Sequence, residues 1–222
     1  GGAVQGDLFA NFTGNEPGEA KNSNLATLET LNCDYQLIDT EEKRTKIIQK
    51  LLTSKILSLD TETTGTEPMD AELVGMSFSI AENEAFYVPV PADQEEALKI
   101  VNEFRPVFEN ENSLKVGQNI KYDMIVLQNY GVQVKGPLFD TMIAHYVLQP
   151  ELRHGMDYLA EIYLRYQTIH IDELIGPKGK NQKNMRDLAP KDVYRYACED
   201  ADVTLKLKNV LEKELKENDA ER

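Results

Sequence analysis

The most informative part of the chain is Ile56-Leu57-Ser58-Leu59-Asp60-Thr61-Glu62-Thr63-Thr64-Gly65, an apolar run that ends in two carboxylates and a turn. Because strand side chains alternate faces with a period of two, Asp60 and Glu62 should share one face at the end of a buried central strand. Solvated carboxylates at a strand end are the simpler interpretation of this pair. The alternative is a hard-cation site, because Mg²⁺ and Mn²⁺ prefer oxygen ligands and offset the repulsion between carboxylates. Further carboxylates elsewhere in the chain would favour the second interpretation.

The segments after this strand predict how a sheet is built around it. Residues 73–80 and 85–90 read as two more strands, and the short loops between the three favour an antiparallel meander. Apolar positions at helical spacing predict a helix over residues 93–108, followed by a short strand at 114–117. A helical crossover between two strands implies that those strands pair in parallel.

The remaining segments complete an α/β pattern. We expect an edge strand at residues 33–38, a short strand near 138–139, and helices at 41–52, 121–130, 141–148, 156–164 and 190–217. The fold class is therefore α/β, a mixed sheet of about five strands with helices on both faces. Residues 1–30 read as a flexible linker, with 8–12 as a short docking motif, and 31–222 as one domain of a longer chain.

Composition limits the class of function. The 222 residues carry a net charge of −14, which repels nucleic acid at long range unless cations neutralise the site. No apolar stretch approaches the roughly 20 residues that a membrane span needs, so we expect a soluble, cytoplasmic protein without a membrane partner. Cys33 and Cys198 are too few for a disulfide framework and are expected to be reduced.

A third carboxylate, Asp123, falls in the first turn of the helix expected after Gly117. Free N–H groups and the helix dipole would favour its ionised form, which is ordinary chemistry for a helix N-terminus. If the helix already includes Asn119, then Asn119 and Asp123 are four residues apart and share a face.

A fourth carboxylate, Asp200, lies one helical turn after Tyr196 on the last helix, so the two share a face. A hydrogen bond from this helix to the core would explain the pair equally well. The small residues Ala197 and Ala201 should let the same face approach the sheet closely. The neighbouring Glu199 and Asp202 point elsewhere and are expected to be solvated.

Together these pieces resemble the DEDDy branch of 3′–5′ exonucleases, and more closely the proofreading domains of bacterial family A DNA polymerases. The resemblance spans residues 34–217 and rests on ordered motifs: Leu59-Asp60-Thr61-Glu62-Thr63, Leu73-Val74-Gly75-Met76-Ser77-Phe78, Lys115-Val116-Gly117-Gln118-Asn119-Ile120-Lys121-Tyr122-Asp123, Phe139-Asp140-Thr141-Met142, Met156-Asp157-Tyr158-Leu159-Ala160-Glu161, Gly179-Lys180-Asn181-Gln182 and Tyr196-Ala197-Cys198-Glu199-Asp200-Ala201-Asp202-Val203-Thr204. It implies a ribonuclease H-like fold.

The resemblance also implies a catalytic site. It places Asp60, Glu62, Asp123 and Asp200 around two divalent cations, Mg²⁺ or Mn²⁺, about 4 Å apart. Asp60 would bridge the cations, Glu62 and Asp200 would complete the tighter site, and Asp123 would act largely through water. Tyr196 and Glu62 would orient the attacking water. Without metal, the crowded carboxylates should repel one another and some of their pKa values should rise.

The substrate contacts that the resemblance implies are the backbone around Thr61 and the side chains of Gln118, Asn119, Tyr122 and Arg153. The Arg153 assignment follows a segment that is one residue shorter than in the enterobacterial relatives.

Two further positions depart from the family pattern. Thr66 stands where enterobacterial relatives have a Leu wedged against the terminal base, and Ile171 replaces an aromatic residue that stacks on that base. Stacking contributes about 1–3 kcal/mol per base, so we expect weaker binding of single strands.

The histidines and a basic loop have separate interpretations. His145 is expected in the core, His154 beside Arg153 and within reach of phosphate, and His170 exposed. Lys178, Lys180, Lys183 and Arg186 form a loop that is either simply solvated or contacts the DNA backbone.

The function implied is removal of mismatched nucleotides from DNA 3′ ends, with release of deoxynucleoside monophosphates. The expected partners are a single-stranded or frayed DNA 3′ end and a polymerase domain of the same full-length chain, with the isolated domain a monomer. Two alternatives stay open: an RNA 3′ exonuclease like ribonuclease D, and a catalytically silent domain that supports a polymerase.

Overall fold

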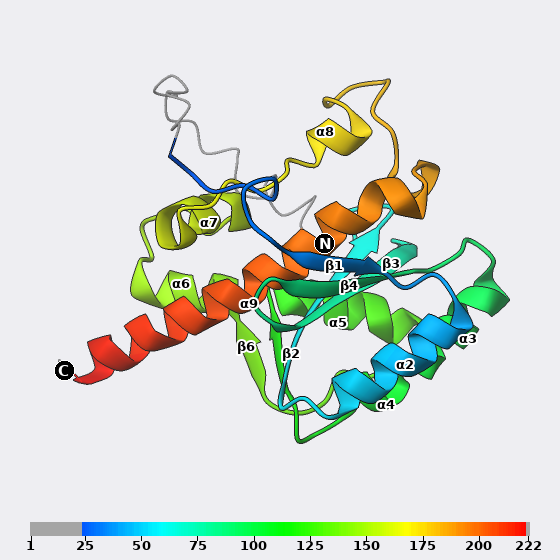
Figure 1. Ribbon diagram of the computed structural model, residues 1–222, viewed down its shortest axis with the longest axis horizontal. Helices are drawn as coiled ribbons and strands as arrows, with labels where there is room; N and C mark the ends of the chain where they lie inside the picture. The colour runs from blue at the N-terminus through cyan, green and yellow to red at the C-terminus, as the bar shows by residue number, and fades with distance from the viewer. Residues whose placement is uncertain (1–23, 221–222) are drawn as a thin grey trace.

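A computed structural model describes residues 24–220, and its centre is one six-stranded mixed sheet (Figure 1). The strands are β1 Asp34–Leu37, β2 Ile56–Thr63, β3 Leu73–Ala81, β4 Glu84–Pro89, β5 Leu114–Gly117 and β6 Leu138–Asp140, in the spatial order β1-β4-β3-β2-β5-β6. The predicted antiparallel meander of β2, β3 and β4 is confirmed, and so is the parallel pairing of β2 with β5. The sheet has six strands against the expected count of about five, because the short segments expected at 33–38 and 138–139 both form edge strands, β1 and β6, each paired in parallel to its neighbour.

Helices cover both faces of the sheet, as predicted. They are α2 Glu41–Leu52, α3 Gln94–Glu103, α4 Arg105–Phe108, α5 Ile120–Asn129, α6 Thr141–Leu148, α7 Met156–Leu164, α8 Asp172–Ile175 and α9 Pro190–Ala220, with a 3-10 turn at Met185–Asp187. The long helix α9 runs diagonally across one face of the sheet and packs on β1 to β5 (Figure 1). Helices α2 to α5 supply side chains to the core on the other face.

Local chemistry explains where several helices begin and end. Thr40 and Asp93 cap α2 and α3 by accepting the backbone N–H of the third residue after each. The single helix predicted over residues 93–108 is in fact two, α3 and α4, which meet at Phe104. Pro106 accounts for the break, because proline has no N–H to donate and its ring clashes with the carbonyl four residues back.

The core lies mainly between the sheet and helices α2 to α5. Leu57 and Leu59 of β2 point into it, next to Phe78, whose ring stacks on that of Phe104 with centroids 5.3 Å apart. On the opposite face, two smaller apolar clusters join α9 to the sheet and to α6 and α7. Strand β2 is therefore buried on both faces, which agrees with its nearly continuous apolar run.

The boundary of the predicted linker needs correction. Residues 1–23, including the possible docking motif at 8–12, lie outside the described residues. Ala26 already pairs with Tyr166, and its amide donates to the Arg165 carbonyl at 2.9 Å. Leu28 is buried as well. The last residues of the predicted linker thus pack on the segment after α7. Among the helices of residues 24–220, none is long and apolar enough to cross a membrane.

Candidate active site

Strand β2 presents Asp60 and Glu62 toward α9, as the period-two pattern predicts. Ser58, two residues before Asp60, donates its hydroxyl to the Ala201 carbonyl of α9 at 2.7 Å, which identifies this face. Asp60 lies opposite Ser77 and Glu62 opposite Gly75 in the antiparallel pair with β3. The register shifts between Glu62 and Thr63, and such a bulge bends the strand end and re-aims its side chains.

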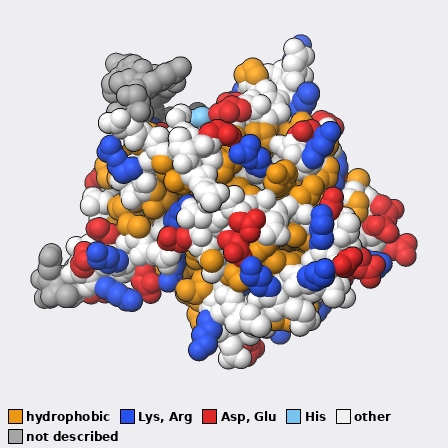
Figure 2. All heavy atoms as spheres, viewed as in Figure 1, with side chains coloured by type: hydrophobic (Ala, Val, Ile, Leu, Met, Phe, Trp, Pro, Cys, Tyr) orange, Lys and Arg blue, Asp and Glu red, His pale blue; other side chains and the backbone are white. Residues whose placement is uncertain are grey.

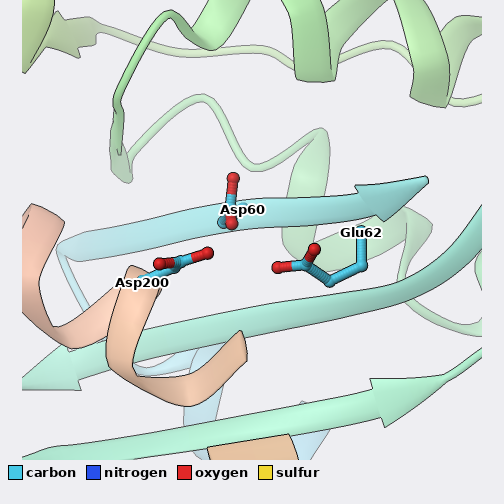
Figure 3. A group of neighbouring side chains, drawn as sticks. All are labelled: Asp60, Glu62 and Asp200. Atoms are coloured by element: carbon cyan, nitrogen blue, oxygen red, sulfur yellow. The ribbon is translucent and has the colours of Figure 1, made fainter. Parts of the chain in front are cut away.

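Helix α9 supplies the third carboxylate. Ala197 and Ala201 are fully buried, as expected for small residues that let a helix lie close to a sheet. Asp200 enters between them and faces the strand end, so that the ligand oxygens of Asp60, Glu62 and Asp200 lie within 4.8 Å of one another. Figure 3 shows the three side chains converging, two from β2 and one from α9. We call these three residues the carboxylate cluster.

Asp123 approaches from the other side of β2. Its Oδ1 accepts the backbone N–H of Thr61 at 3.0 Å and the Thr61 hydroxyl at 2.5 Å. Because Thr61 points away from α9, Asp123 lies beside the cluster and is not one of its three converging residues. The four carboxylates that the sequence groups together therefore divide into the three of the carboxylate cluster and Asp123, which lies beside them.

The start of α5 differs in detail from the expectation for Asp123. The helix begins at Ile120, and Asn119 has a left-handed backbone with φ 55°, so Asn119 and Asp123 do not share a helical face. Asp140 anchors this helix start by accepting the backbone N–H groups of Asn119 and Ile120, both at 3.0 Å. Free helix N–H groups do not dominate the electrostatics of Asp123 either. Burial, followed by the charge of Asp60, raises its pKa to about 7.

The electrostatics of the cluster fit a cation. Burial and then the charge of Asp60 raise the pKa of Glu62 to about 8, and burial with the charges of Asp60 and Glu62 raises that of Asp200 well above its usual range. Glu62, Asp123 and Asp200 each keep one buried carboxylate oxygen without a hydrogen-bond partner among the described residues. Buried oxygens left unsatisfied cost free energy, and hard divalent cations take such ligands. The donor set therefore suits Mg²⁺ or Mn²⁺.

Tyr196 lies one turn before Asp200 and is almost fully buried. Its pKa is raised well above the usual range by burial and then by the negative charges of Asp200, Glu62 and Asp60. The phenol therefore stays protonated, and its hydroxyl keeps a proton that it can donate. Its ring belongs to the apolar cluster between β3, β4 and α9.

Two other carboxylates of α9, Glu199 and Asp202, correct the sequence analysis, which expected them to be solvated. Both are fully buried. Glu199 accepts the Tyr166 hydroxyl at 2.6 Å and the Ile169 amide at 2.7 Å. Asp202 accepts the Tyr35 hydroxyl at 2.6 Å and the Asn83 amide at 2.9 Å. We call Glu199 and Asp202 the tethering pair, because each joins α9 to a segment distant in sequence.

The tethering pair was missed because helix α9 is buried on more than one side. A period-3.6 pattern assigns charged positions off the apolar face to solvent. Partners that come from β1, from the β3–β4 turn and from the segment after α7 leave no local signal on α9 itself. The tyrosines at positions 35 and 166 are the only sequence hints, because a buried tyrosine hydroxyl needs a hydrogen-bond partner.

The predicted substrate contacts lie at different depths. Tyr122 donates its hydroxyl to the Gly65 carbonyl at 2.6 Å, which fixes the turn that carries the exposed Thr66. Ile171 is half-buried and packs on the apolar cluster that contains Tyr196. Arg153 is exposed, with its guanidinium 4.9 Å from the centre of the Tyr158 ring. These positions are open to a ligand, and their substrate roles stay predictions.

Gln118 and Thr61 are engaged inside the protein. Gln118 is buried, donates its amide to the His154 carbonyl at 2.7 Å and accepts the Thr141 hydroxyl. The Thr61 amide is bonded to Asp123. Gln118 thus contacts the segment next to Arg153, and its predicted contact with substrate stays a prediction.

The expectations for the histidines are confirmed where the structure tests them. His145 is fully buried, and its Nδ1 lies 2.6 Å from Nδ1 of His154, so one of the two rings must donate to the other. Burial lowers the pKa of both, in His145 together with the neighbouring His154. His170 is exposed, as predicted, and its Nδ1 lies 3.3 Å from Oδ2 of Asp157.

The basic loop divides into two parts. Arg186 donates to the carbonyls of Val90 and Leu73, at 2.6 and 2.8 Å, and so clamps the ends of β3 and β4 rather than facing solvent as a DNA contact. Lys178, Lys180 and Lys183 are exposed. Over the face shown in Figure 2, Lys and Arg side chains are scattered among Asp and Glu side chains rather than gathered into one basic patch. A DNA role for the three lysines stays a prediction.

Comparison with known proteins identifies the family to which this site belongs. Residues 35–216 match the family described as 3′–5′ exonuclease. The chain belongs to that family. The exonuclease chain is 34% identical over 206 residues to DNA polymerase I of Borreliella burgdorferi, covering 91% of this chain and 22% of the relative. It therefore spans about a fifth of the length of that relative.

Solved structures show the same ribonuclease H-like fold as this exonuclease. Brucella melitensis NrnC with bound Mg²⁺ superposes with a TM-score of 0.60 at 19% identity, covering 85% of this chain and 84% of that one. Escherichia coli RNase D, an exoribonuclease involved in structured RNA processing, has a TM-score of 0.64 at 18% identity, covering 82% of this chain and 45% of that one.

Proposed function

We propose that this domain removes mismatched nucleotides from DNA 3′ ends by metal-dependent phosphodiester hydrolysis. The observation that carries the proposal is the carboxylate cluster, three buried acids from β2 and α9 within 4.8 Å of one another, with Asp123 beside them. Glu62 and Asp200 each keep a buried oxygen without a hydrogen-bond partner among residues 24–220, which is unfavourable alone, and divalent cations would stabilise such oxygens. The relative NrnC was solved with Mg²⁺, which supports the choice of metal.

The proposed roles are those that the family resemblance implies, and the positions of the side chains support them. Asp60, Glu62 and Asp200 would hold the metal ions, with Asp123 contributing from the α5 side of β2. When bound, two such ions would lower the pKa of the attacking water and stabilise the leaving 3′ oxygen. Tyr196, buried and protonated next to Asp200, would orient the water together with Glu62. The Tyr122 hydroxyl fixes the Gly65 turn, so that Thr66 would lie against the terminal base.

The DNA substrate is proposed from the relative in which this domain occurs. The Borreliella protein is a DNA polymerase I, and the matched region is a fifth of its length. A polymerase domain in the same chain would deliver a 3′ end, and a mismatched terminus would unpair at lower cost than a matched one. Thr66 and Ile171 offer smaller contacts to the terminal base than the family pattern, so binding of single strands would be weak.

Digestion of a 5′-labelled single-stranded DNA in millimolar Mn²⁺ tests the proposal. We expect a ladder of products that shorten by one nucleotide from the 3′ end, and release of nucleoside 5′-monophosphates. A DNA blocked by a 3′ phosphorothioate linkage should persist. The Asp60→Ala variant should give no ladder, and activity that survives this change would come from a contaminant. Internal cuts, or no cleavage by the wild-type protein, would overturn the proposal.

A ribonuclease D-like activity is the second candidate, because an RNase D shares the fold over most of this chain. A DNA and an RNA oligomer of the same sequence, digested side by side, separate the two candidates. Faster shortening of DNA supports the proofreading assignment, whereas faster shortening of RNA replaces it. A catalytically silent domain is disfavoured, because all four carboxylates and Tyr196 are present.

A further inference from the structure

Glu199, the residue before Asp200, makes two short hydrogen bonds that reach a single segment. Its carboxylate accepts the Tyr166 hydroxyl at 2.6 Å and the Ile169 amide at 2.7 Å, and it is fully buried. Successive residues of an α-helix are rotated by about 100°, so Glu199 faces away from the carboxylate cluster while Asp200 faces into it. Helix α9 therefore binds the segment after α7 on one side and builds the catalytic site on the adjacent side.

The segment that Glu199 holds lies against the apolar cluster to which Tyr196 belongs. Ile169 and Ile171, with Leu174 and Ile175 of α8, pack against the apolar cluster that contains Tyr196. Between Tyr166 and Ile169, Thr168 adds a further bond, in which its hydroxyl donates to Asp157 at 2.6 Å. Backbone bonds already hold the start of the segment, where Tyr166 bridges to Ala26 and the Gln167 amide donates to the Ala26 carbonyl at 2.8 Å. Residues 168–170 have no such pairing, so the side-chain bonds to Thr168 and Ile169 fix the backbone there.

We infer that Glu199 is a positioning residue, which holds residues 166–171 against α9 so that Ile171 and the ring of Tyr196 are placed to receive the terminal nucleotide. This inference rests on the proposed exonuclease function and extends it to a residue outside the metal site. Because both donors lie 2.6–2.7 Å from the carboxylate, the length of the Glu199 side chain sets the distance between α9 and the segment. The length of this side chain, rather than its charge, should therefore determine substrate binding.

The competing explanation is that Glu199 merely stabilises the fold, and Asp202 provides a matched control for it. Asp202 is equally buried on the same helix and also accepts a tyrosine hydroxyl at 2.6 Å. Its partners, Tyr35, Asn83 and Lys206, belong to β1, the β3–β4 turn and α9 itself, and not to residues 166–171. A loss of stability common to both variants would not affect substrate binding at Ile171 and Tyr196, whereas loss of the Glu199 tether would.

Steady-state cleavage of single-stranded DNA by three variants tests the inference. Glu199→Asp keeps the charge beside Asp200 but is one methylene shorter, so we expect KM to rise about tenfold with kcat within about twofold of wild type. Glu199→Gln keeps the reach and should leave KM near the wild-type value. Asp202→Asn should also leave KM unchanged. Hydrogen exchange should show a faster-exchanging Ile169 amide in Glu199→Asp only.

Each other outcome would overturn the inference. An unchanged KM in Glu199→Asp shows that the tether does not place the substrate. An equal rise in Asp202→Asn assigns the effect to general stability, and a larger rise in Glu199→Gln assigns it to charge. A fall in kcat alone means that Glu199 acts through Asp200. If the wild-type protein itself cleaves no DNA, the proposed function fails and not the tether, which the exchange of the Ile169 amide reports independently.

Discussion

Helix α9 contributes to two groups of buried carboxylates that differ in their hydrogen bonding: the carboxylate cluster, which it shares with β2, and the tethering pair. In the carboxylate cluster, Glu62 and Asp200 each retain a buried oxygen without a hydrogen-bond partner among residues 24–220. In the tethering pair, Glu199 and Asp202 are buried to the same degree, and each accepts a tyrosine hydroxyl and a backbone amide. Burial of carboxylates is therefore common to both groups, whereas the unpartnered oxygens of Glu62 and Asp200 have no counterpart in the tethering pair.

This difference in hydrogen bonding indicates how a metal site can be distinguished from a structural hydrogen-bond network in an acidic protein. Satisfied carboxylates stabilise the fold, whereas carboxylates that face one another without donors raise its free energy until a cation binds. Removing a carboxylate should consequently have different effects in the two groups. In the carboxylate cluster it should abolish catalysis, and in the tethering pair it should lower the stability of the fold.

The largest expected effect is on catalysis. Mutation of residues that merely orient metal ligands costs about 10–100-fold in activity, so loss of a ligand itself in Asp60→Ala should cost more than about a hundredfold. Asp202→Asn, from the tethering pair, should retain activity within a few-fold of wild type. Initial rates of single-stranded DNA cleavage at saturating Mn²⁺ measure both. Comparable losses in the two variants would remove the distinction between the groups.

The next largest expected effect is on stability, and here a change in the tethering pair should cost more than a change in the carboxylate cluster. Asp202→Ala leaves the part-buried Tyr35 hydroxyl without its acceptor, at about 1–3 kcal/mol, and also removes the acceptor of the Asn83 amide on the exposed β3–β4 turn. Asp200→Ala removes a repulsive charge from the metal-free cluster and should be neutral or stabilising. Urea unfolding in EDTA compares the two. A destabilisation of Asp200→Ala as large as that of Asp202→Ala would show that the cluster is stabilised by bonds within the protein.

Metal binding should stabilise the protein through the carboxylate cluster alone. At a free Mn²⁺ concentration a hundred times Kd, the gain is about 2.7 kcal/mol, which for a domain of this size raises Tm by several degrees. Asp60→Ala should lose this shift, and Asp202→Asn should keep it. Thermal unfolding with and without Mn²⁺ provides the measurement. An unchanged melting curve of the wild-type protein in millimolar Mn²⁺ would argue against a metal site.

The smallest expected effect, counted for a single pH unit, is the change in the free energy of unfolding of the metal-free protein with pH. In the folded protein the pKa of Glu62 is about 8 and that of Asp123 about 7, against ordinary values of 4.5 and 3.8. Between these values the folded state holds more protons than the unfolded state, so stability should fall as pH rises from about 4.5 to 8. The slope is at most about 1.4 kcal/mol per pH unit for each proton.

Glu62→Gln removes one of these titrating groups and provides the control for the pH dependence. Urea unfolding in EDTA at several pH values between 5 and 8 should give a flatter curve for this variant than for the wild-type protein. A wild-type stability that rises over the same range would show that the folded protein does not hold the extra protons.

Much of the fold was predictable because its signals are local. The alternation in β2, the cap at Thr40 and the helical spacing of 141–148 each depend on residues close in sequence. The approach of α9 to the sheet also follows from two small residues, Ala197 and Ala201. The break between α3 and α4 was missed although Pro106 marks it, because the apolar spacing continues through the proline.

The site was predictable in composition but not in arrangement. The sequence places Asp60 and Glu62 on one face, but it contains no information that Thr61 presents Asp123 from the other side of the strand. Likewise, Glu199 is buried only because residues 166–169 pack over α9, and this packing is a tertiary contact between segments about 30 residues apart in sequence. Long-range contacts of this kind leave no periodicity to detect.

The tethering pair also sets the rotation of α9 about its own axis. One residue of helix corresponds to about 100° of rotation and about 1.5 Å of rise. An insertion or deletion between Glu199 and Asp202 would therefore rotate the tethering carboxylates relative to Asp200, and the helix could not keep their hydrogen bonds and also direct Asp200 toward β2. The spacing of these residues on α9 is thus constrained during evolution, whereas the exposed loop around Lys178 and Lys180 carries no such constraint from this helix.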